Sequence, residues 1–261
     1  RKNMISQMIG VGKAHAKIIL VGEHAVVYNQ PAIAIPLTNL TVTTTIQPAF
    51  VGQTIESNTF HGGLDELGAN VEGLRQLILR LITHFQLQKA PFTIEIDTNI
   101  PQERGFGASA AFATSITKAF FDFANAPLSP EQLKYFTDLE ESISHGSASG
   151  LDAATVNSTD PIWFVKNDLP TPFKMSLTGT LVVADTGIHG QTMHAVNIVK
   201  GNLDSDYDLT WQKIAHLGKI AEKVRIDLAQ NQPEHAGLLF TAAHHELQSL
   251  GISHPKLDNL V

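Results

Sequence analysis

Apolar positions along the first half of the chain predict short strands separated by one amphipathic helix. The run Ala16–Val21 is apolar and β-rich and ends at Gly22, which predicts a strand that enters a tight turn. Val and Thr residues over 40–46 predict a second strand, and apolar–polar alternation over 92–97 predicts a third, buried on one face. Between these two strands, apolar residues recur at helical spacing over 70–87. The first half of the chain therefore alternates between strands and helix.

Two more helices are predicted after the third strand. The first covers the Ala-rich stretch 109–124, which follows a loop that contains glycines. The second should begin at Ser129, because Ser129 is a suitable N-cap, Pro130 takes the first helical position and Gln132 completes a capping box. Gly146 suits the position just past the end of this helix.

The second half of the chain is predicted to be mainly helical. A β-rich run over 177–185 predicts one strand, and two helices should follow at 209–230 and 234–250. A Pro-containing connector before this strand suggests a boundary between an N-terminal lobe of residues 1–175 and a C-terminal lobe of residues 176–261. The expected buried stripe of the first helix consists of Ile214, Leu217, Ala221, Val224 and Leu228.

Composition excludes several kinds of site. The chain has no cysteine, so disulfides, thiolate nucleophiles and cysteine-ligated zinc are ruled out.

Its first fifteen residues lack the apolar core of a signal peptide, and no apolar run is long enough for a membrane helix, so we expect a cytoplasmic protein with no membrane partner. The formal charge of −7 argues against nucleic acid as a partner, because phosphate backbones are bound by clustered Lys and Arg.

The twelve histidines do not form a recognisable metal motif. The sequence has no HExxH pattern. His244 and His245 are adjacent on a predicted helix, so their side chains should point in different directions. A histidine metal site is therefore disfavoured.

Three short segments carry candidate chemistry. Gly105 and Gly107 precede a predicted helix, and glycines next to a helix N-terminus can bring backbone N–H groups close to a phosphate. The pattern is not that of a P-loop, so an ordinary turn remains an alternative. The second segment contains Lys17 near the first turn, and Lys17 could simply be a solvated residue at a strand edge. The third contains Asp152 among small residues, and Asp152 could simply be a turn residue.

Taken together and in order, these segments resemble the motifs of the GHMP kinase superfamily, which includes galactokinases, homoserine kinases, mevalonate kinases and phosphomevalonate kinases. The matches span residues 13–160, and the amino-acid sequence of the first motif is similar to that of the mevalonate kinase family. The motifs are Ala16-Lys17-Ile-Ile-Leu-Val-Gly-Glu23-His24-Ala-Val-Val-Tyr28-Asn-Gln-Pro-Ala32, Gly105-Phe-Gly-Ala-Ser109-Ala-Ala111 and His145-Gly-Ser-Ala-Ser-Gly150-Leu-Asp152.

The resemblance implies a fold, a reaction and a set of site residues. It implies a two-lobed α+β fold with an N-terminal lobe of the ribosomal S5 domain 2-like type and a ferredoxin-like C-terminal lobe. It also implies ATP and Mg²⁺ as cofactors, mevalonate as the acceptor, and a homodimer as a common state of family members. Asp152 would act as the base beside Lys17, and Ser109 and Glu141 would bind the metal. The residues expected around the ATP phosphates are Arg104, Gly105, Phe106, Gly107, Ala108, Ser109, Ala110 and Ala111, and those expected around the acceptor are Lys17, Glu23, His24, Asp152 and Thr192.

The choice of metal carboxylate has two candidates. The family spacing, counted back from Asp152, leads to Glu141. Apolar residues of the predicted helix define a face on which Glu140 falls, which leaves Glu141 free to turn toward a site. We therefore expect Glu141 first and Glu140 second.

The sequence departs from the family pattern at two places. The third, glycine-rich motif has no counterpart before Val261, so the C-terminal lobe is expected to be incomplete and the chain shortened. Ala108 stands where relatives often have serine, so Ser109 would supply the hydroxyl alone.

Two other functions remain open at this stage. One is a related kinase that takes phosphomevalonate or galactose, although a phosphorylated acceptor would favour basic residues that the stretch 26–31 lacks. The other is a catalytically silent relative that binds nucleotide and regulates a partner.

Overall fold

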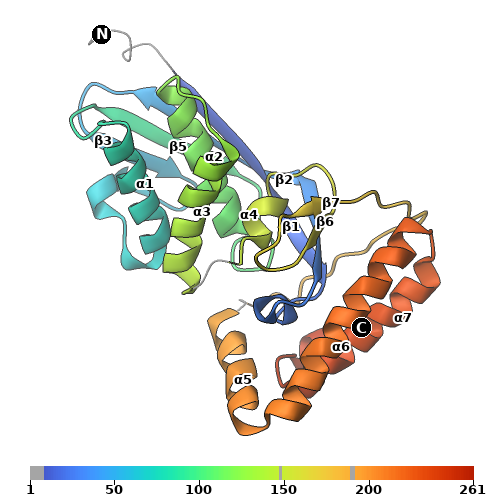
Figure 1. Cartoon of the computed structure of the whole chain (residues 1–261). Coiled ribbons are helices and arrows are strands. Elements are labelled where there is room, and N and C mark those ends of the chain that lie inside the picture. The colour runs from blue at the N-terminus through green and yellow to red at the C-terminus, as the bar shows by residue number, and fades with distance from the viewer. Residues whose placement is uncertain (1–8, 147–148, 189–191) are drawn as a thin grey trace. The chain divides into compact units, whose positions relative to one another are not determined.

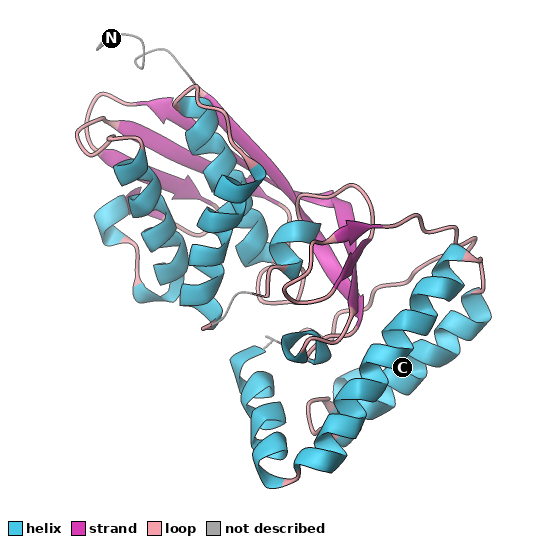
Figure 2. Ribbon diagram, viewed as in Figure 1, coloured by secondary structure: helices cyan, strands magenta, loops and turns pink. Residues whose placement is uncertain are grey.

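The structure is a computed structural model that describes residues 9–146, 149–188 and 192–261. It mixes helices and strands, as predicted (Figures 1 and 2). The chain divides into two compact units, and each unit draws on separate stretches of sequence. The predicted single boundary near residue 175 stays a prediction. Unit 1 contains the residues up to Ala16 together with 37–102 and 106–157, and unit 2 contains 17–36, 103–105 and 158–261.

The sheet of unit 1 combines parallel and antiparallel pairs. Strand β3 (Gln53–Ser57) pairs in parallel with β5 (Phe92–Thr98) and antiparallel with β4 (His61–Gly63). On its other side, β5 pairs antiparallel with β2 (Ala32–Pro48). The strands predicted at 40–46 and 92–97 are confirmed, and the alternation of 92–97 places Phe92 and Ile94 in the core.

Three helices lie side by side against one face of this sheet (Figure 1). They are α1 (Glu72–His84), α2 (Ala108–Phe123) and α3 (Pro130–His145), and all three were predicted. Two short 3₁₀ turns, Leu64–Glu66 and Ala69–Val71, precede α1. Large buried side chains of the core between helices and sheet are Ile46, Leu77, Leu81, Phe92, Ile94, Ile116, Phe120 and Phe136.

The start of α3 follows the predicted cap chemistry closely. The hydroxyl of Ser129 accepts a hydrogen bond from the Gln132 amide at 3.2 Å, and the Ser129 amide donates to Oε1 of Gln132 at 3.0 Å. Pro130 takes the first helical position, and Gly146 ends the helix in a left-handed conformation with φ +76°. Local sequence alone therefore determines both ends of this helix.

Strand β1 (Gly10–Val21) begins six residues before the predicted start at Ala16. Two glycines in the additional N-terminal part of this strand, Gly10 and Gly12, pack against the backbone of α2. A Cβ atom on Gly12 would come within 2.5 Å of the Ala119 amide nitrogen, so only glycine allows the helix to approach this closely. The sequence signal was weak because glycine is depleted in strands.

Among its described residues, unit 2 contains a short antiparallel sheet and four α-helices. Strand β6 (Ile162–Phe164) pairs antiparallel with residues Ala32–Ala34 of β2 and with β7 (Thr171–Pro172). The helices are α5 (Thr192–Ser205), α6 (Tyr207–Ala229), α7 (Pro233–Ser249) and α8 (Pro255–Asp258).

Helices α6 and α7 lie side by side in unit 2 and confirm the two predicted C-terminal helices (Figure 1). All five residues of the predicted stripe on α6 are buried. On α7, His244 is buried and lies 3.0 Å from Asp258, whereas His245 is exposed, as their adjacent positions predicted. No helix in the described ranges is both long and apolar enough to cross a membrane.

The strand predicted at 177–185 is wrong, because this segment has no regular secondary structure. A strand is stable only when its backbone groups pair with a neighbouring strand, and none pairs with this segment within the described part of the chain. Val182, inside this run, is 81% exposed, so its side chain has little packing contact. Helix α5 was not predicted, because its apolar positions do not form a clear stripe.

Candidate active site

The turn after β1 has an unusual backbone. Gly22 has φ +96°, and a Cβ atom there would lie 2.6 Å from Cα of Ala32. The Ala25 amide donates to the carbonyl oxygen of Glu23 at 2.7 Å, which closes a γ-turn centred on His24. His24 has φ +60° and ψ −44°, a strained conformation for a residue other than glycine. The short helical turn Ala25–Tyr28 follows. Such strain is concentrated at functional sites.

Lys17, Glu23 and His24 all belong to unit 2. Lys17 is only 4% exposed. Burial raises the pKa of Glu23, while backbone hydrogen bonds and the positive charge of Lys17 oppose that rise. Burial lowers the pKa of His24, which favours its neutral form at pH 7. The predicted acceptor-binding residues of this turn therefore include an acid and a base with perturbed ionisation.

The glycine-containing loop leads directly into the N-terminus of α2. Gly105 and Gly107 have φ +78° and +69°, values that favour glycine. Gly107 is the N-cap of α2 and offers no side chain to the free amides of the first turn. Apart from the two chain neighbours of Gly105, no described atom lies within 4 Å of the position that its Cβ would occupy. These free amides and the positive end of the helix dipole suit a phosphate group.

Ser109 lies in this first turn and contacts a carboxylate of α3. Its hydroxyl donates to Oε1 of Glu140 at 2.6 Å. The sequence predicted Ser109 and Glu141 as the metal pair, so the carboxylate found against Ser109 is the second candidate rather than the first. As predicted, Glu140 lies on the buried face of α3 and is only 1% exposed.

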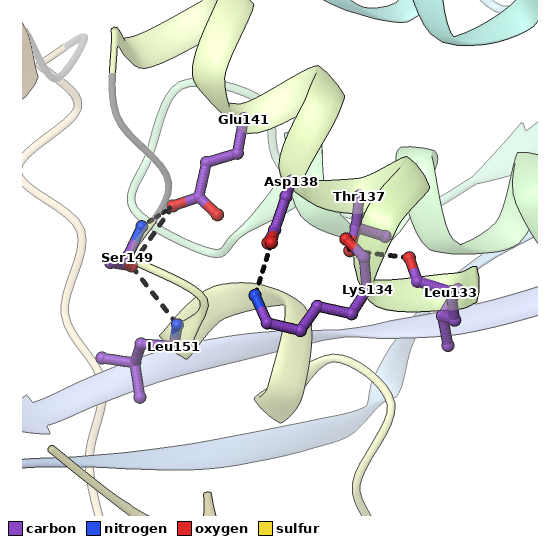
Figure 3. Close-up of polar contacts among 7 residues, drawn as sticks. All are labelled: Leu133, Lys134, Thr137, Asp138, Glu141, Ser149 and Leu151. Atoms are coloured by element: carbon purple, nitrogen blue, oxygen red, sulfur yellow. Dashed lines mark hydrogen bonds and ion pairs between the residues drawn. The ribbon is translucent and has the colours of Figure 1, made fainter. Parts of the chain in front are cut away.

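Glu141 faces a different partner, the segment that leads to α4 (Leu151–Thr155). Its Oε1 accepts hydrogen bonds from the amide and the hydroxyl of Ser149, at 3.0 Å and 3.2 Å (Figure 3). Burial raises the pKa of Glu141, and the negative charge of Asp152 adds to this rise while the Ser149 hydrogen bonds oppose it. Glu141 and Asp152 are therefore electrostatically coupled, and a bound cation would relieve their repulsion.

Asp152 lies in the first turn of α4. Gly150 precedes this helix with φ +80°, and the Ser149 hydroxyl accepts a hydrogen bond from the Leu151 amide at 3.3 Å (Figure 3). These turn contacts determine where α4 begins and so where the Asp152 carboxylate lies. Asp152 and Glu141 belong to unit 1, whereas Lys17 belongs to unit 2.

Other predicted site residues have partners of their own or are not described. Arg104, expected near the ATP phosphates, forms an ion pair with Asp185 at 3.3 Å within unit 2. Asp185 also accepts from the amide of Gly187 at 2.9 Å. Thr192 begins α5, but its side chain lies outside the described residues, as do residues 147–148 of the third motif. The roles of Arg104 and Thr192 stay predictions.

The donor chemistry fits Mg²⁺, which prefers oxygen ligands and is commonly held by one or two carboxylates together with phosphates and water. The hydroxyl of Ser109 and the carboxylates of α3 supply such oxygens. Oε2 of Glu140 and Oε2 of Glu141 are buried and accept no hydrogen bond within the described ranges of the chain. No group of three or more His, Cys, Asp or Glu side chains placed to hold a metal occurs among the described residues.

Two residues of this region were missed by the sequence reasoning. Ser144 donates to Oε1 of Glu140 at 2.6 Å, and its position four residues along the helix is a signal that could have found it. Gly73 of α1 packs against both residues. No local pattern marks Gly73, because its role depends on how α1 and α3 pack.

The chain is similar to several known proteins. Residues 74–158 match the family described as "GHMP kinases N terminal domain". The crystal structure of mevalonate kinase from methicillin-resistant Staphylococcus aureus is 30% identical and has a TM-score of 0.69; the match covers 97% of this chain and 81% of that one. The mevalonate kinase of Aeropyrum pernix is 28% identical, over 95% of this chain and 79% of that protein. L. major mevalonate kinase, solved in complex with R-mevalonate, is 20% identical with a TM-score of 0.76; the match covers 97% of this chain and 79% of that one.

Proposed function

Since the chain belongs to the mevalonate kinase family of the GHMP kinases, we propose that it transfers the γ-phosphoryl group of ATP to the primary hydroxyl of mevalonate. The product, 5-phosphomevalonate, belongs to the early part of isoprenoid biosynthesis.

One observation carries this proposal in the structure. The glycine-capped N-terminus of α2 places the hydroxyl of Ser109 2.6 Å from Glu140 of α3. The next residue of α3 is Glu141, and the negative charge of Asp152 helps to raise its pKa. An anion-binding turn beside several carboxylates is the combination that a nucleotide with its divalent cation requires. A turn with only a structural role would not need buried carboxylates.

The roles of individual residues are assigned by the family resemblance. The amides of the first turn of α2 bind the ATP phosphates, and Ser109 and Glu141 hold Mg²⁺. When bound, the ion neutralises negative charge on the phosphates as the transition state forms. Asp152 accepts the proton of the attacking hydroxyl, and Lys17 supplies a positive charge that stabilises negative charge on the transferred group. Glu23 and His24 contribute to the acceptor pocket.

Positioning and electrostatics are expected to contribute more than proton abstraction. Phosphoryl transfer usually has a loose transition state, in which little proton transfer is needed early. A general base is worth about 10²–10⁴ in rate, whereas correct orientation of the reactants can contribute more. Asp152 therefore acts as much by orienting the acceptor hydroxyl as by accepting its proton.

A coupled assay of ADP release tests the proposed reaction. Purified protein is given ATP and Mg²⁺ with mevalonate, phosphomevalonate or galactose in separate reactions. Of the three acceptors, we expect only mevalonate to support turnover. This turnover should be lost when EDTA removes the divalent cation. Turnover with another acceptor would reassign the substrate within the superfamily. ATP binding without turnover on any acceptor would favour a regulatory role. A homodimer stays a prediction that light scattering can test.

A further inference from the structure

The carboxylate of Glu140 is held in the interior of unit 1 by two hydroxyl groups. Oε1 accepts from Ser109 of α2 and from Ser144 of α3, both at 2.6 Å. Oε2 is buried and accepts no hydrogen bond from the residues that the structure describes, and Glu140 is only 1% exposed. All the hydrogen bonds that the structure gives this side chain therefore meet at one oxygen atom, and one of them comes from Ser109.

A glycine on a third helix leaves room for this arrangement. Gly73 lies in the first turn of α1, and a Cβ atom there would approach Oε1 of Glu140 to 2.9 Å and the hydroxyl of Ser144 even more closely. Ordinary contacts of a Cβ atom are longer than 3.4 Å. Any larger residue at this position would thus push Glu140 and Ser144 away from their present places.

The contact determines how the Ser109 hydroxyl is oriented. In this contact the Ser109 hydroxyl is the donor, so its proton lies toward the carboxylate oxygen of Glu140. The lone pairs of the Ser109 oxygen then remain available to a cation, whereas a freely rotating hydroxyl could turn its proton toward the metal. Metal ligands are commonly oriented by such hydrogen bonds to a second group.

A purely structural clamp between α2 and α3 explains the contact less well. Burying a carboxylate is costly, and apolar residues of similar volume often stabilise a protein as well or better. The unbonded Oε2 adds to that cost. The carboxylate is therefore better explained by its effect on Ser109 than by stability.

We propose that Glu140 is the positioning residue of the metal site: it holds the proton of Ser109 and so directs the Ser109 oxygen toward the divalent cation that accompanies ATP. This inference rests on the proposed function, in which Ser109 binds that cation. It assigns Glu140 no direct contact with metal or substrate.

Two conservative substitutions separate positioning from direct metal binding. Glu140→Asp keeps the charge but withdraws the carboxylate by one methylene, which breaks the contact with Ser109. Glu140→Gln keeps the length and an acceptor oxygen but loses the charge. A positioning residue should tolerate Gln better than Asp, whereas a metal ligand should be damaged at least as much by Gln.

The experiment measures Mn²⁺ binding to the full chain in the presence of a non-hydrolysable ATP analogue, by electron paramagnetic resonance of free Mn²⁺. We expect Glu140→Asp to weaken Mn²⁺ binding about tenfold and Glu140→Gln to weaken it about threefold or less, in line with other residues that orient metal ligands. In a Ser109→Ala background, Glu140→Asp should cause no further loss, because the oriented group is gone. Asp138→Asn, on the same helix and paired with Lys134, serves as the charge-matched control and should bind Mn²⁺ normally.

The possible outcomes are distinguishable. Normal Mn²⁺ binding by Glu140→Asp, while Ser109→Ala binds weakly, would overturn this inference and leave the proposed function intact. Equal losses from Asp and Gln, or additive losses with Ser109→Ala, would also overturn it. Normal binding by Ser109→Ala would remove the metal assignment of the proposed function, and this inference with it. Thermal unfolding of every variant checks that the fold is kept.

Discussion

The Ser109 hydroxyl donates to the carboxylate of Glu140 at 2.6 Å, and Glu141, the next residue, bonds instead to Ser149. Two adjacent carboxylates on one helix thus accept hydrogen bonds from different residues, because consecutive side chains on a helix point about 100° apart. Glu140 faces α2 and the core, whereas Glu141 faces the segment that carries Asp152. This division of contacts underlies the predictions that follow.

Removing the charge of Asp152 should abolish most turnover without preventing nucleotide binding. Asp152→Asn keeps the shape of the side chain but can neither accept a proton nor orient the acceptor hydroxyl as strongly. We expect kcat to fall by at least about 100-fold, while the dissociation constant for ATP changes little. Steady-state kinetics and equilibrium nucleotide titration measure the two quantities.

Asp160→Asn is the matched control, because Asp160 lies in an exposed turn shortly after α4. It should leave kcat unchanged. Full turnover in Asp152→Asn would rule out the assigned catalytic role.

A methyl group on Gly105 should harm nucleotide binding more than folding. Gly105 has φ +78°, so alanine there carries a backbone strain of about 1 kcal/mol, but beyond the chain neighbours no described atom lies within 4 Å of the added methyl group. We expect the dissociation constant for ATP to rise about tenfold or more, because the backbone can no longer approach the phosphates. Isothermal titration calorimetry and thermal unfolding report the two effects separately. Unaltered ATP affinity would show that this loop is an ordinary turn.

Gly73→Ala should destabilise unit 1, because the new methyl group would displace Glu140 and Ser144. Overpacking of this kind costs about 1–3 kcal/mol. Gly201→Ala gives a matched comparison, since Gly201 lies in α5 and, apart from its own helix backbone and chain neighbours, no described atom lies within 4 Å of the new atom. That change should stabilise its helix by about 0.5–1 kcal/mol. Chemical denaturation of both variants provides the test, and equal effects would contradict the packing at Gly73.

The stability of the protein should depend on pH through Glu23. Burial raises the pKa of Glu23 above its ordinary value of 4.5, so the folded chain binds this proton more tightly than the unfolded chain. The associated stability is fully present below about pH 4.5 and is lost as the pH rises through the folded pKa. Glu23→Gln cannot ionise. Its unfolding free energy relative to wild type should therefore increase as the pH rises above about 4.5.

Urea unfolding at several pH values measures this difference. Glu222→Gln, at an exposed position on α6, shows the effect of removing one negative charge from the surface. A gap between Glu23→Gln and wild type that stays constant with pH would contradict the prediction. Greater stability of Glu23→Gln together with weaker mevalonate binding would indicate that this residue is kept for function rather than stability.

The sequence by itself determined the features that depend on neighbouring residues. Helical periodicity predicted α1, α6 and α7, and the cap residues around Ser129 and Gly146 predicted both ends of α3. The glycine conformations at the start of α2 could likewise be expected from the residue types. These features were accessible because periodicity and capping act over only a few residues.

Only the tertiary structure decided the contacts between distant segments. It placed Glu140 rather than Glu141 against Ser109, brought Gly73 behind that carboxylate, and laid α2 across Gly12 of β1. It also left the β-rich run 177–185 without a paired strand in the described part of the chain. Helix packing and strand pairing join residues that are far apart in the chain, so local propensity cannot predict which groups meet.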